Sequence, residues 1–208
     1  MDPRSFPTKG NLILAKNSLA LARQGYELMD KKRNILIREL MGLIDEAKVI
    51  QEEIDKTFTY AYQCLQKANI EHGISTVEEL AYTVPIEDSV RIQTRSIMGT
   101  EIPKVKYKKE NTRPTYAFST SRESIDIARD AFCRVKELTI KLSEVENSAY
   151  RLASSIKKTQ KRANALKNIT IPMYDNLVYT ITNALEEKER EEFTRLKVIK
   201  RMKTKNRR

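Results

Sequence analysis

Two long stretches of the chain place an apolar residue at every third or fourth position. In the first, seventeen positions taken in steps of three and four hold fifteen apolar residues, interrupted only by Arg33 and Thr57. A 3.5-residue repeat keeps one narrow apolar seam on a helix that winds around a partner, so this stretch predicts a long coiled-coil helix. The positions are Leu12, Ala15, Leu19, Ala22, Tyr26, Met29, Arg33, Leu36, Leu40, Leu43, Ala47, Ile50, Ile54, Thr57, Ala61, Cys64 and Ala68.

The second stretch starts at Ser121 and carries the same repeat. Two consecutive three-residue steps around Val135 resemble a stammer, which overwinds a coiled coil locally. Two seams in one chain predict an antiparallel pair of helices, roughly 85 Å and more than about 110 Å long at 1.5 Å per residue. The seam positions are Ile125, Ala128, Phe132, Val135, Leu138, Leu142, Val145, Ala149, Leu152, Ile156, Thr159, Ala163 and Leu166.

The segment between the two stretches has a different pattern. Ser75 to Tyr82 predicts a short helix, with Ser75 and Glu78 spaced as a capping box. From Val90 to Met98 side chains of two kinds alternate, and the alternation returns at Val105 and Tyr107, which predicts a β-hairpin turning at Gly99-Thr100. As a separate expectation, this hairpin lies near the closed end of the coil. Pro103 suits the start or the edge of the return strand.

The predicted fold is therefore mainly α: a long antiparallel two-helix coiled coil with a small central insert of one short helix and a β-hairpin. We expect a flexible N-terminus (1–10), a first coil helix (11–70) capped by Thr8 or Asn11, an insert (71–118), a second coil helix (119–203) and a basic tail (204–208). If residue 68 opposes 121, Leu12 opposes about residue 177, and the last 25 or so residues have no partner in the chain. We expect Pro172 to kink the second helix.

The formal net charge of +11 indicates either an acidic partner or a solvated basic surface. Near the C-terminus, Phe193, Leu196 and Ile199 form a short apolar stripe, and the last twelve residues contain seven Lys or Arg. This end either docks on another molecule or frays. Gly25, inside the first helix, reflects either drift or the close approach of a neighbouring surface.

No pattern in the chain is typical of catalysis. There is one histidine, His72, with no nucleophile beside it, and there is no glycine-rich phosphate loop. Cys64 and Cys133 are too few and too isolated for a zinc site, and we expect both to be reduced and partly buried. We expect no metal and no cofactor. No apolar run approaches 18 residues and the N-terminus lacks a signal core, so we expect an intracellular protein without a membrane span.

Three motifs, in this order and spacing, resemble the D subunit of V-type ATPases, including the archaeal and bacterial V/A-type enzymes. The resemblance covers nearly the whole chain, and the three motifs are specific only in combination. The first is Pro7-Thr8-Lys9-Gly10-Asn11-Leu12 with Leu21-Ala22-Arg23-Gln24-Gly25-Tyr26-Glu27-Leu28 and Lys31-Lys32-Arg33; the second is Lys161-Arg162-Ala163-Asn164-Ala165-Leu166 with Ile171-Pro172; the third is Glu186-Glu187-Lys188-Glu189-Arg190-Glu191-Glu192-Phe193-Thr194-Arg195-Leu196-Lys197.

The resemblance implies a non-catalytic central axle, or rotor, of a rotary ATPase. Such a subunit stands inside the ring of A and B subunits and joins the F subunit and the funnel-shaped C/d-type subunit on the membrane ring. Its turning couples ATP hydrolysis or synthesis to proton or sodium transport, at the cytoplasmic side of the membrane and without inserting into it.

The resemblance also directs attention to two sets of residues. We expect contacts with the A/B ring from Arg162, Asn164, Leu166, Ile171, Pro172, Arg190, Arg195, Leu196, Lys197 and Lys200. We expect contacts with the F subunit or the membrane-proximal side from Val90, Ile92, Met98, Val105 and Tyr107.

Two other classes of protein share parts of the pattern. A nucleic-acid-binding coiled coil would account for the basic charge, but no basic region leads into a dimerising zipper and no aromatic residues interleave with the basic ones, so we expect no nucleic acid partner. The coiled-coil stalk of an export-apparatus ATPase is a similar helical hairpin. The β-hairpin insert and the Ala165-Leu166…Ile171-Pro172 pattern favour the V-type D subunit instead.

Overall fold

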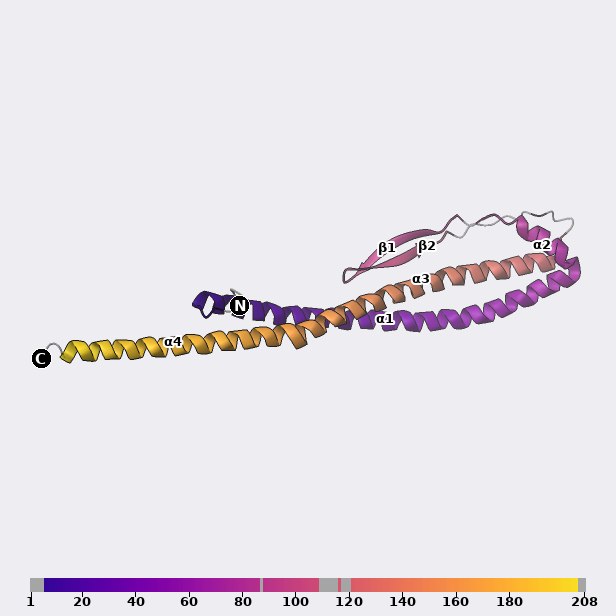
Figure 1. Ribbon diagram of the computed structural model, residues 1–208. Helices are drawn as coiled ribbons and strands as arrows, with labels where there is room; N and C mark the ends of the chain where they lie inside the picture. Colours follow the sequence, from indigo (N-terminus) through magenta and orange to yellow (C-terminus); the bar gives the residue numbers. More distant parts are fainter. Residues whose placement is uncertain (1–5, 87, 109–115, 117–120, 206–208) are drawn as a thin grey trace. The chain divides into compact units, whose positions relative to one another are not determined.

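The computed structural model describes residues 6–86, 88–108, 116 and 121–205. Its elements, shown in Figure 1, confirm the predicted mainly α fold with a short helix and a β-hairpin between two long helical segments. The elements are α1 (Lys9–His72), α2 (Ile74–Tyr82), β1 (Arg91–Ile97), β2 (Thr100–Lys106), α3 (Glu123–Ala165), the π-helix η2 (Leu166–Thr170) and α4 (Ile171–Lys205).

The chain divides into two compact units. Unit 1 contains the described residues up to Arg33 and from Lys157 onward, and unit 2 contains residues 34–156. The helices α1 and α3 contribute to both units. The expected boundary at 118–119 and the last three residues of the expected tail lie outside the described residues.

The first seam is confirmed, because all seventeen of its positions are buried or half-buried. Both interruptions of the seam find polar partners: the Thr57 hydroxyl donates to the Glu53 carbonyl at 2.7 Å, and Arg33 binds polar side chains in unit 1. The Thr8 hydroxyl accepts the Asn11 amide at 3.2 Å, as expected of a cap on α1.

Unit 2 has its core between α1 and α3, which run antiparallel. Residue numbers rise along α1 as they fall along α3. At the closed end the Ser124 hydroxyl donates to the Glu71 carboxylate, and further along Leu36 packs with Leu152. Between these ends, Ile50 and Ile54 pack with Leu138 and Val145, and Ala61 packs with Ala131 and Val135. Cys64 is buried and Cys133 half-buried, both as free thiols.

The short helix and the hairpin turn differ in detail from the predictions. The capping box is wrong: α2 follows Gly73, which has a φ of 83° and accepts the Val77 amide, and no side chain caps the helix. The hairpin turn is Met98-Gly99, one residue earlier than predicted, with Ile97 paired to Thr100. Both turn residues have positive φ, 49° and 74°, the geometry that matches the twist of the flanking strands.

The hairpin lies along α3 within unit 2 (Figure 1). The Lys136 ammonium stands over the Tyr107 ring at 5.5 Å, and the Thr100 and Ser155 hydroxyls are 2.8 Å apart. Ile102 is buried against Leu36 and Leu152. The strands thus extend away from the closed end of the coil, where His72 accepts the Arg122 amide, and the expectation that the hairpin sits at that end is wrong.

In unit 1 the helix pairing is shifted from the predicted register. Lys9 lies 3.3 Å from Glu189, whereas the prediction opposed it to residue 180. Part of the shift arises at the closed end, because α1 continues to His72 and the closing pair is His72 with Arg122 instead of 68 with 121. The π-helix η2 adds to it, since a π-turn holds more residues per turn than an α-turn.

The π-helix also explains how the helix accommodates Pro172. The Ile171 amide donates to the Leu166 carbonyl, five residues back. A proline ring in a regular α-helix clashes with the carbonyl four residues earlier, and widening the preceding turn relieves that clash. The local break expected at Pro172 is therefore a π-turn that ends at Thr170, after which α4 resumes.

Core packing in unit 2 can be tested at Leu152, which is fully buried (0% exposed) against Leu36 and Ile102. We expect Leu152→Ala to lower the free energy of unfolding by about 3 kcal/mol, because it removes buried methyl groups and leaves a cavity. Urea denaturation followed by circular dichroism measures this change. Leu196→Ala, at an exposed position, is the matched control; equal losses in both variants would contradict the assigned core.

Candidate partner-binding surfaces

The predicted site residues fall on three surfaces. The first, here called the coil surface, is the part of unit 1 from Arg162 to Pro172. Arg162, Asn164 and Pro172 are exposed, while Leu166 and Ile171 are half-buried. A Cβ atom built on Gly25 would lie 3.8 Å from the Leu166 side chain, which is ordinary contact. Leu166 thus contributes to packing between the two helical segments of unit 1, while its exposed neighbours face outward.

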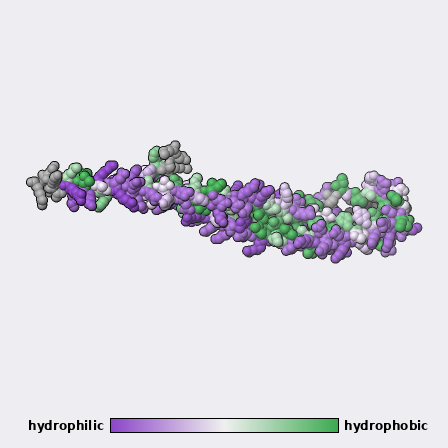
Figure 2. Space-filling view, turned by 60° about the horizontal axis from the view of Figure 1, so that its bottom comes forward, coloured by the Kyte–Doolittle hydropathy of each residue, from purple (hydrophilic) through white to green (hydrophobic). Residues whose placement is uncertain are grey.

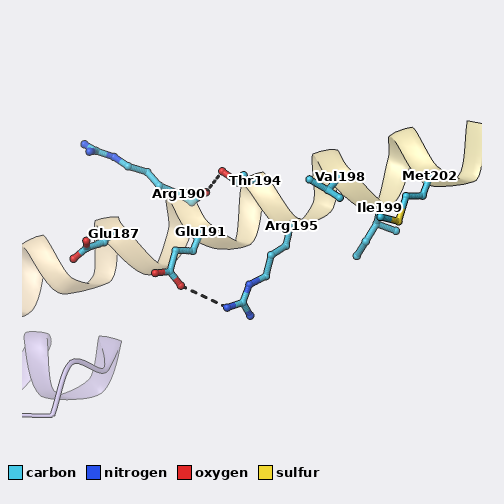
Figure 3. A pocket seen from close by; sticks show the side chains of 8 residues that line it. All are labelled: Glu187, Arg190, Glu191, Thr194, Arg195, Val198, Ile199 and Met202. Atoms are coloured by element: carbon cyan, nitrogen blue, oxygen red, sulfur yellow. Dashed lines mark hydrogen bonds and ion pairs between the residues drawn. The ribbon is translucent and has the colours of Figure 1, made fainter.

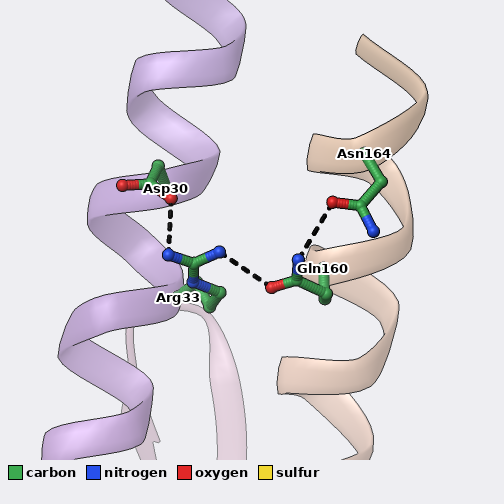
Figure 4. Close-up of polar contacts among 4 residues, drawn as sticks. All are labelled: Asp30, Arg33, Gln160 and Asn164. Carbon is green, nitrogen blue, oxygen red and sulfur yellow. Dashed lines mark hydrogen bonds and ion pairs between the residues drawn. The ribbon is translucent and has the colours of Figure 1, made fainter. Parts of the chain in front are cut away.

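A polar network crosses the helices of unit 1 beside the coil surface (Figure 4). The Arg33 guanidinium lies 2.7 Å from the Asp30 carboxylate and donates to the Gln160 side-chain oxygen at 2.9 Å. The Gln160 amide in turn donates to Asn164 at 3.0 Å. A polar group at a seam position favours the one register in which it is satisfied, so this network helps to fix the pairing of the helices.

The second surface, the tail surface, is the C-terminal part of α4 from Arg190 to Lys203. Every residue from Glu186 to Lys203 is exposed, including the predicted Arg190, Arg195, Leu196, Lys197 and Lys200. Between residues 193 and 205 there are six Lys or Arg and no Asp or Glu. Figure 2 shows a small hydrophobic group near this end of a largely hydrophilic helix.

A groove on the tail surface is lined by α4 alone (Figure 3). Arg195 lies 3.7 Å from Glu191, one turn earlier, and the Thr194 hydroxyl donates to the Arg190 carbonyl at 2.8 Å. Val198, Ile199 and Met202 form its apolar part, and all three are exposed. Because all the lining residues lie on one helix, these apolar side chains remain in contact with water unless another protein covers them.

The third surface, the hairpin surface, belongs to unit 2. Val90, Ile92 and Met98 are exposed, and Val105 and Tyr107 are half-buried. The structure brings Val90, Ile92 and Val105 together beside α3, where they line a groove with Pro103 and Ile140. Met98 is separated from them, because it occupies the turn at the hairpin tip.

The predictions missed one exposed apolar group in unit 2. Ile74, Tyr82, Val84 and Ile86 follow the closed end of the coil, and Ile86 is 90% exposed. The helix α2 has no buried residue, although it is amphipathic. The signal was available in the sequence, since Val84 and Ile86 flank Pro85 and none of the four residues belongs to either coiled-coil repeat.

Comparison with known proteins identifies the family. The family model for the ATP synthase D subunit matches residues 11–201. The chain belongs to the ATP synthase D-subunit family. The V-type ATP synthase D subunit of Thermotoga neapolitana is 44% identical over 194 residues, covering 93% of this chain and 96% of that protein. The A-type ATP synthase D subunit of Pyrococcus abyssi is 36% identical over 197 residues, covering 93% and 92%.

Two further observations concern this member of the D-subunit family. None of its described helices is long and apolar enough to cross a membrane. Among the described residues, no group of three or more His, Cys, Asp or Glu side chains is arranged to hold a metal ion.

If Gly25 reflects drift, the chain should tolerate an alanine there; if another helix approaches it closely, an alanine should destabilise the fold. Alanine fits at this position in the free chain, and an alanine is better than a glycine inside a helix by about 1 kcal/mol. We expect Gly25→Ala to raise the free energy of unfolding by roughly that amount, measured by urea denaturation, with Gly42→Ala as the control at a second open position. A destabilised Gly25→Ala variant alone would show that the helices of unit 1 pack more closely than described.

Proposed function

We propose that this chain is the central rotor of a V/A-type ATP synthase, a non-catalytic subunit that transmits torque between a ring of A and B subunits and an ion-translocating ring in the membrane. Its action couples ATP hydrolysis or synthesis to the transport of protons or sodium ions. Membership of the D-subunit family supports a place in the complex. The tail surface is the observation that carries the rotor role.

The tail surface has the chemistry expected of an end that docks. Lys9, the first residue of α1, pairs with Glu189, and α4 continues beyond this pair to Lys205, exposed as far as Lys203. Its basic side chains favour an acidic surface on the A and B subunits, and its exposed apolar side chains Val198, Ile199 and Met202 would leave water if such a surface covered them. The other predicted ring contacts, on the coil surface, belong to the same proposal.

A rotor must also meet non-equivalent neighbours in turn. Deep specific pockets at each contact would hold it at one angle, whereas shallow, mixed surfaces allow each neighbour to be biased by a small difference in contact free energy. The coil surface fits this requirement, since its exposed residues lie around a π-turn and are spread along a helix.

In this proposal, the partners on the membrane side bind unit 2. The apolar group at Ile74, Tyr82, Val84 and Ile86 offers a surface for the C/d-type funnel subunit, and the hairpin surface offers one for the F subunit. With these partners the chain is peripheral to the membrane on its cytoplasmic side. An export-apparatus stalk would instead co-purify with a single homohexameric ATPase.

Locking the tail to the ring tests the rotor role. A photocrosslinker with a cleavable disulfide linker is attached to a cysteine in place of Thr194, after Cys64 and Cys133 are replaced by alanine. We expect crosslinking to an A or B subunit to abolish steady-state ATP hydrolysis in the reconstituted complex, and reduction of the linker to restore it. A crosslinked complex that keeps its full rate over many turnovers would rule out rotation of this chain against the ring.

The charge of the tail makes a second prediction. We expect Lys197→Gln with Lys200→Gln to weaken binding to the A/B ring about 10-fold at low salt, with a smaller difference at about 0.5 M salt, because the screening length then falls to a few ångströms. Titration of the ring with labelled chain measures the affinity. Lys56→Gln with Lys67→Gln removes the same charge from α1 in unit 2 and is the control. An identical salt profile for both double variants would contradict an acidic seat for the tail.

A further inference from the structure

The two strands of the hairpin differ in how their outer edges are satisfied. Three side chains of α3 bind the outer main chain of β2: Glu144 accepts the Val105 amide at 3.0 Å, Ser148 donates to the Pro103 carbonyl at 3.2 Å, and Arg151 donates to the Glu101 carbonyl at 3.4 Å. Pro103, which has no amide hydrogen, confirms the predicted edge position. The edge of β2 is thus covered by a helix.

The register shows what the other edge must present. In an antiparallel pair, directly opposed residues point their main-chain groups either both inward or both outward. Since Glu101, Pro103 and Val105 point outward, their partners Ser96, Thr94 and Ile92 point outward from β1 on the opposite side. Ile92 is 71% exposed, and no described residue outside the sheet hydrogen-bonds to these three main-chain segments.

An edge that no described residue covers is uncommon in a stable sheet. Proteins usually cover, shorten or interrupt such an edge, because its unpaired amides and carbonyls can pair with another strand. Here β1 has seven residues, no proline within it and six exposed side chains. The charges that protect edges against unspecific pairing are present, as Arg91 and Arg95, and they also restrict which strand can bind.

The side chains flanking the edge define the chemistry of that strand. One face of the hairpin carries Arg91, Arg95, Lys104 and Lys106, all exposed, and Arg91 lies directly opposite Lys106. Like charges in direct opposition destabilise a pair of strands, and an acidic neighbour would relieve that repulsion. The other face carries Val90 and Ile92, which line the groove beside α3.

We propose that the open edge of β1 binds an extended segment of a partner protein as an added β-strand, and that this segment alternates acidic with apolar residues. The acidic side chains lie beside Arg91 and Arg95, and the apolar ones lie on the side of the groove. Main-chain hydrogen bonds supply affinity in this mode, and the alternating side chains supply specificity. A second copy of β1 is disfavoured because it would bring arginines together. The proposal concerns the main-chain edge of β1, and its test uses the free chain, so it can fail or succeed separately from the rotor role and from the assignment of the hairpin surface to the F subunit.

The test uses the full chain and a labelled, end-blocked peptide of about eight alternating glutamate and valine residues, the length of a typical strand, with binding followed by fluorescence anisotropy. We expect Thr94→Pro to weaken binding at least about 10-fold, because it removes an outward amide and adds a ring at the edge. Thr94→Val keeps the amide and should stay within about 2-fold. A lysine–valine peptide should bind the unchanged chain about as weakly as the glutamate–valine peptide binds Thr94→Pro. The double variant Arg91→Glu with Arg95→Glu should bind the glutamate–valine peptide equally weakly.

Amide hydrogen exchange by NMR makes the test independent of any variant. In the free chain the amides of Ile92, Thr94 and Ser96 should exchange rapidly, while those of Gln93 and Arg95, which point toward β2, are protected. The peptide should protect the first three. Unchanged exchange of these amides on peptide binding would overturn the proposal. A dimer of the chain that Thr94→Pro abolishes would also overturn it, because the edge would then bind a second copy. So would displacement of the peptide by single-stranded DNA that binds Thr94→Pro and Thr94→Val with equal affinity, because the basic face and not the strand edge would then be the binding site.

Discussion

The apolar seam repeated every 3.5 residues is the constraint on which the structure depends. Each long helix on its own exposes a stripe of apolar side chains, and only the pairing of the two stripes removes them from water. The fully buried Leu36 and Leu152 in unit 2, and the seam residues Ala15 and Ala163 in unit 1, show how narrow that shared surface is. The hairpin packs on this seam through Ile102, and the coil and tail surfaces lie on the exposed sides of the helices.

The polar interruption of the seam at Arg33 helps to set the register of the helices in unit 1. Arg33 is half-buried and donates to Gln160 on the facing helix, whereas its ion pair with Asp30 lies within α1, so a slip of the helices in unit 1 would cost it the hydrogen bond to Gln160. The π-turn before Pro172 has a related effect, since it changes which residues of α4 face α1. A helix pair fixed in this way can carry exposed surfaces at defined positions.

Periodicity alone was sufficient to predict the two long helices, their antiparallel pairing and the strands of the hairpin. The errors in the predicted helix start, hairpin turn and register arose where the backbone conformation of a single residue decides the geometry. The positive φ values of Gly73 and Met98 moved a helix start and a turn, and the extension of α1 to His72 shifted the register of unit 1. The course of the hairpin along α3 depends on Glu144, Ser148 and Arg151, which look in the sequence like ordinary surface residues of a helix.

The candidate surfaces were predictable as stretches but not as contacts. The basic end of α4 and the alternation from Val90 to Tyr107 are visible in the sequence, whereas the difference between the covered edge of β2 and the open edge of β1 is not, because it depends on which strand α3 contacts. The resemblance to the V-type D subunit suggested the rotor role, and the structure supplied the surfaces through which such a role would be exerted.

Direct observation of rotation tests the central claim most simply. A complex of A and B subunits is fixed to a surface, and a bead is attached to the chain through a cysteine in place of Tyr150, which is exposed in unit 2. If the chain is the rotor, ATP will drive continuous rotation of the bead in one direction. A bead that stays at a fixed angle while the same complexes hydrolyse ATP would contradict the account.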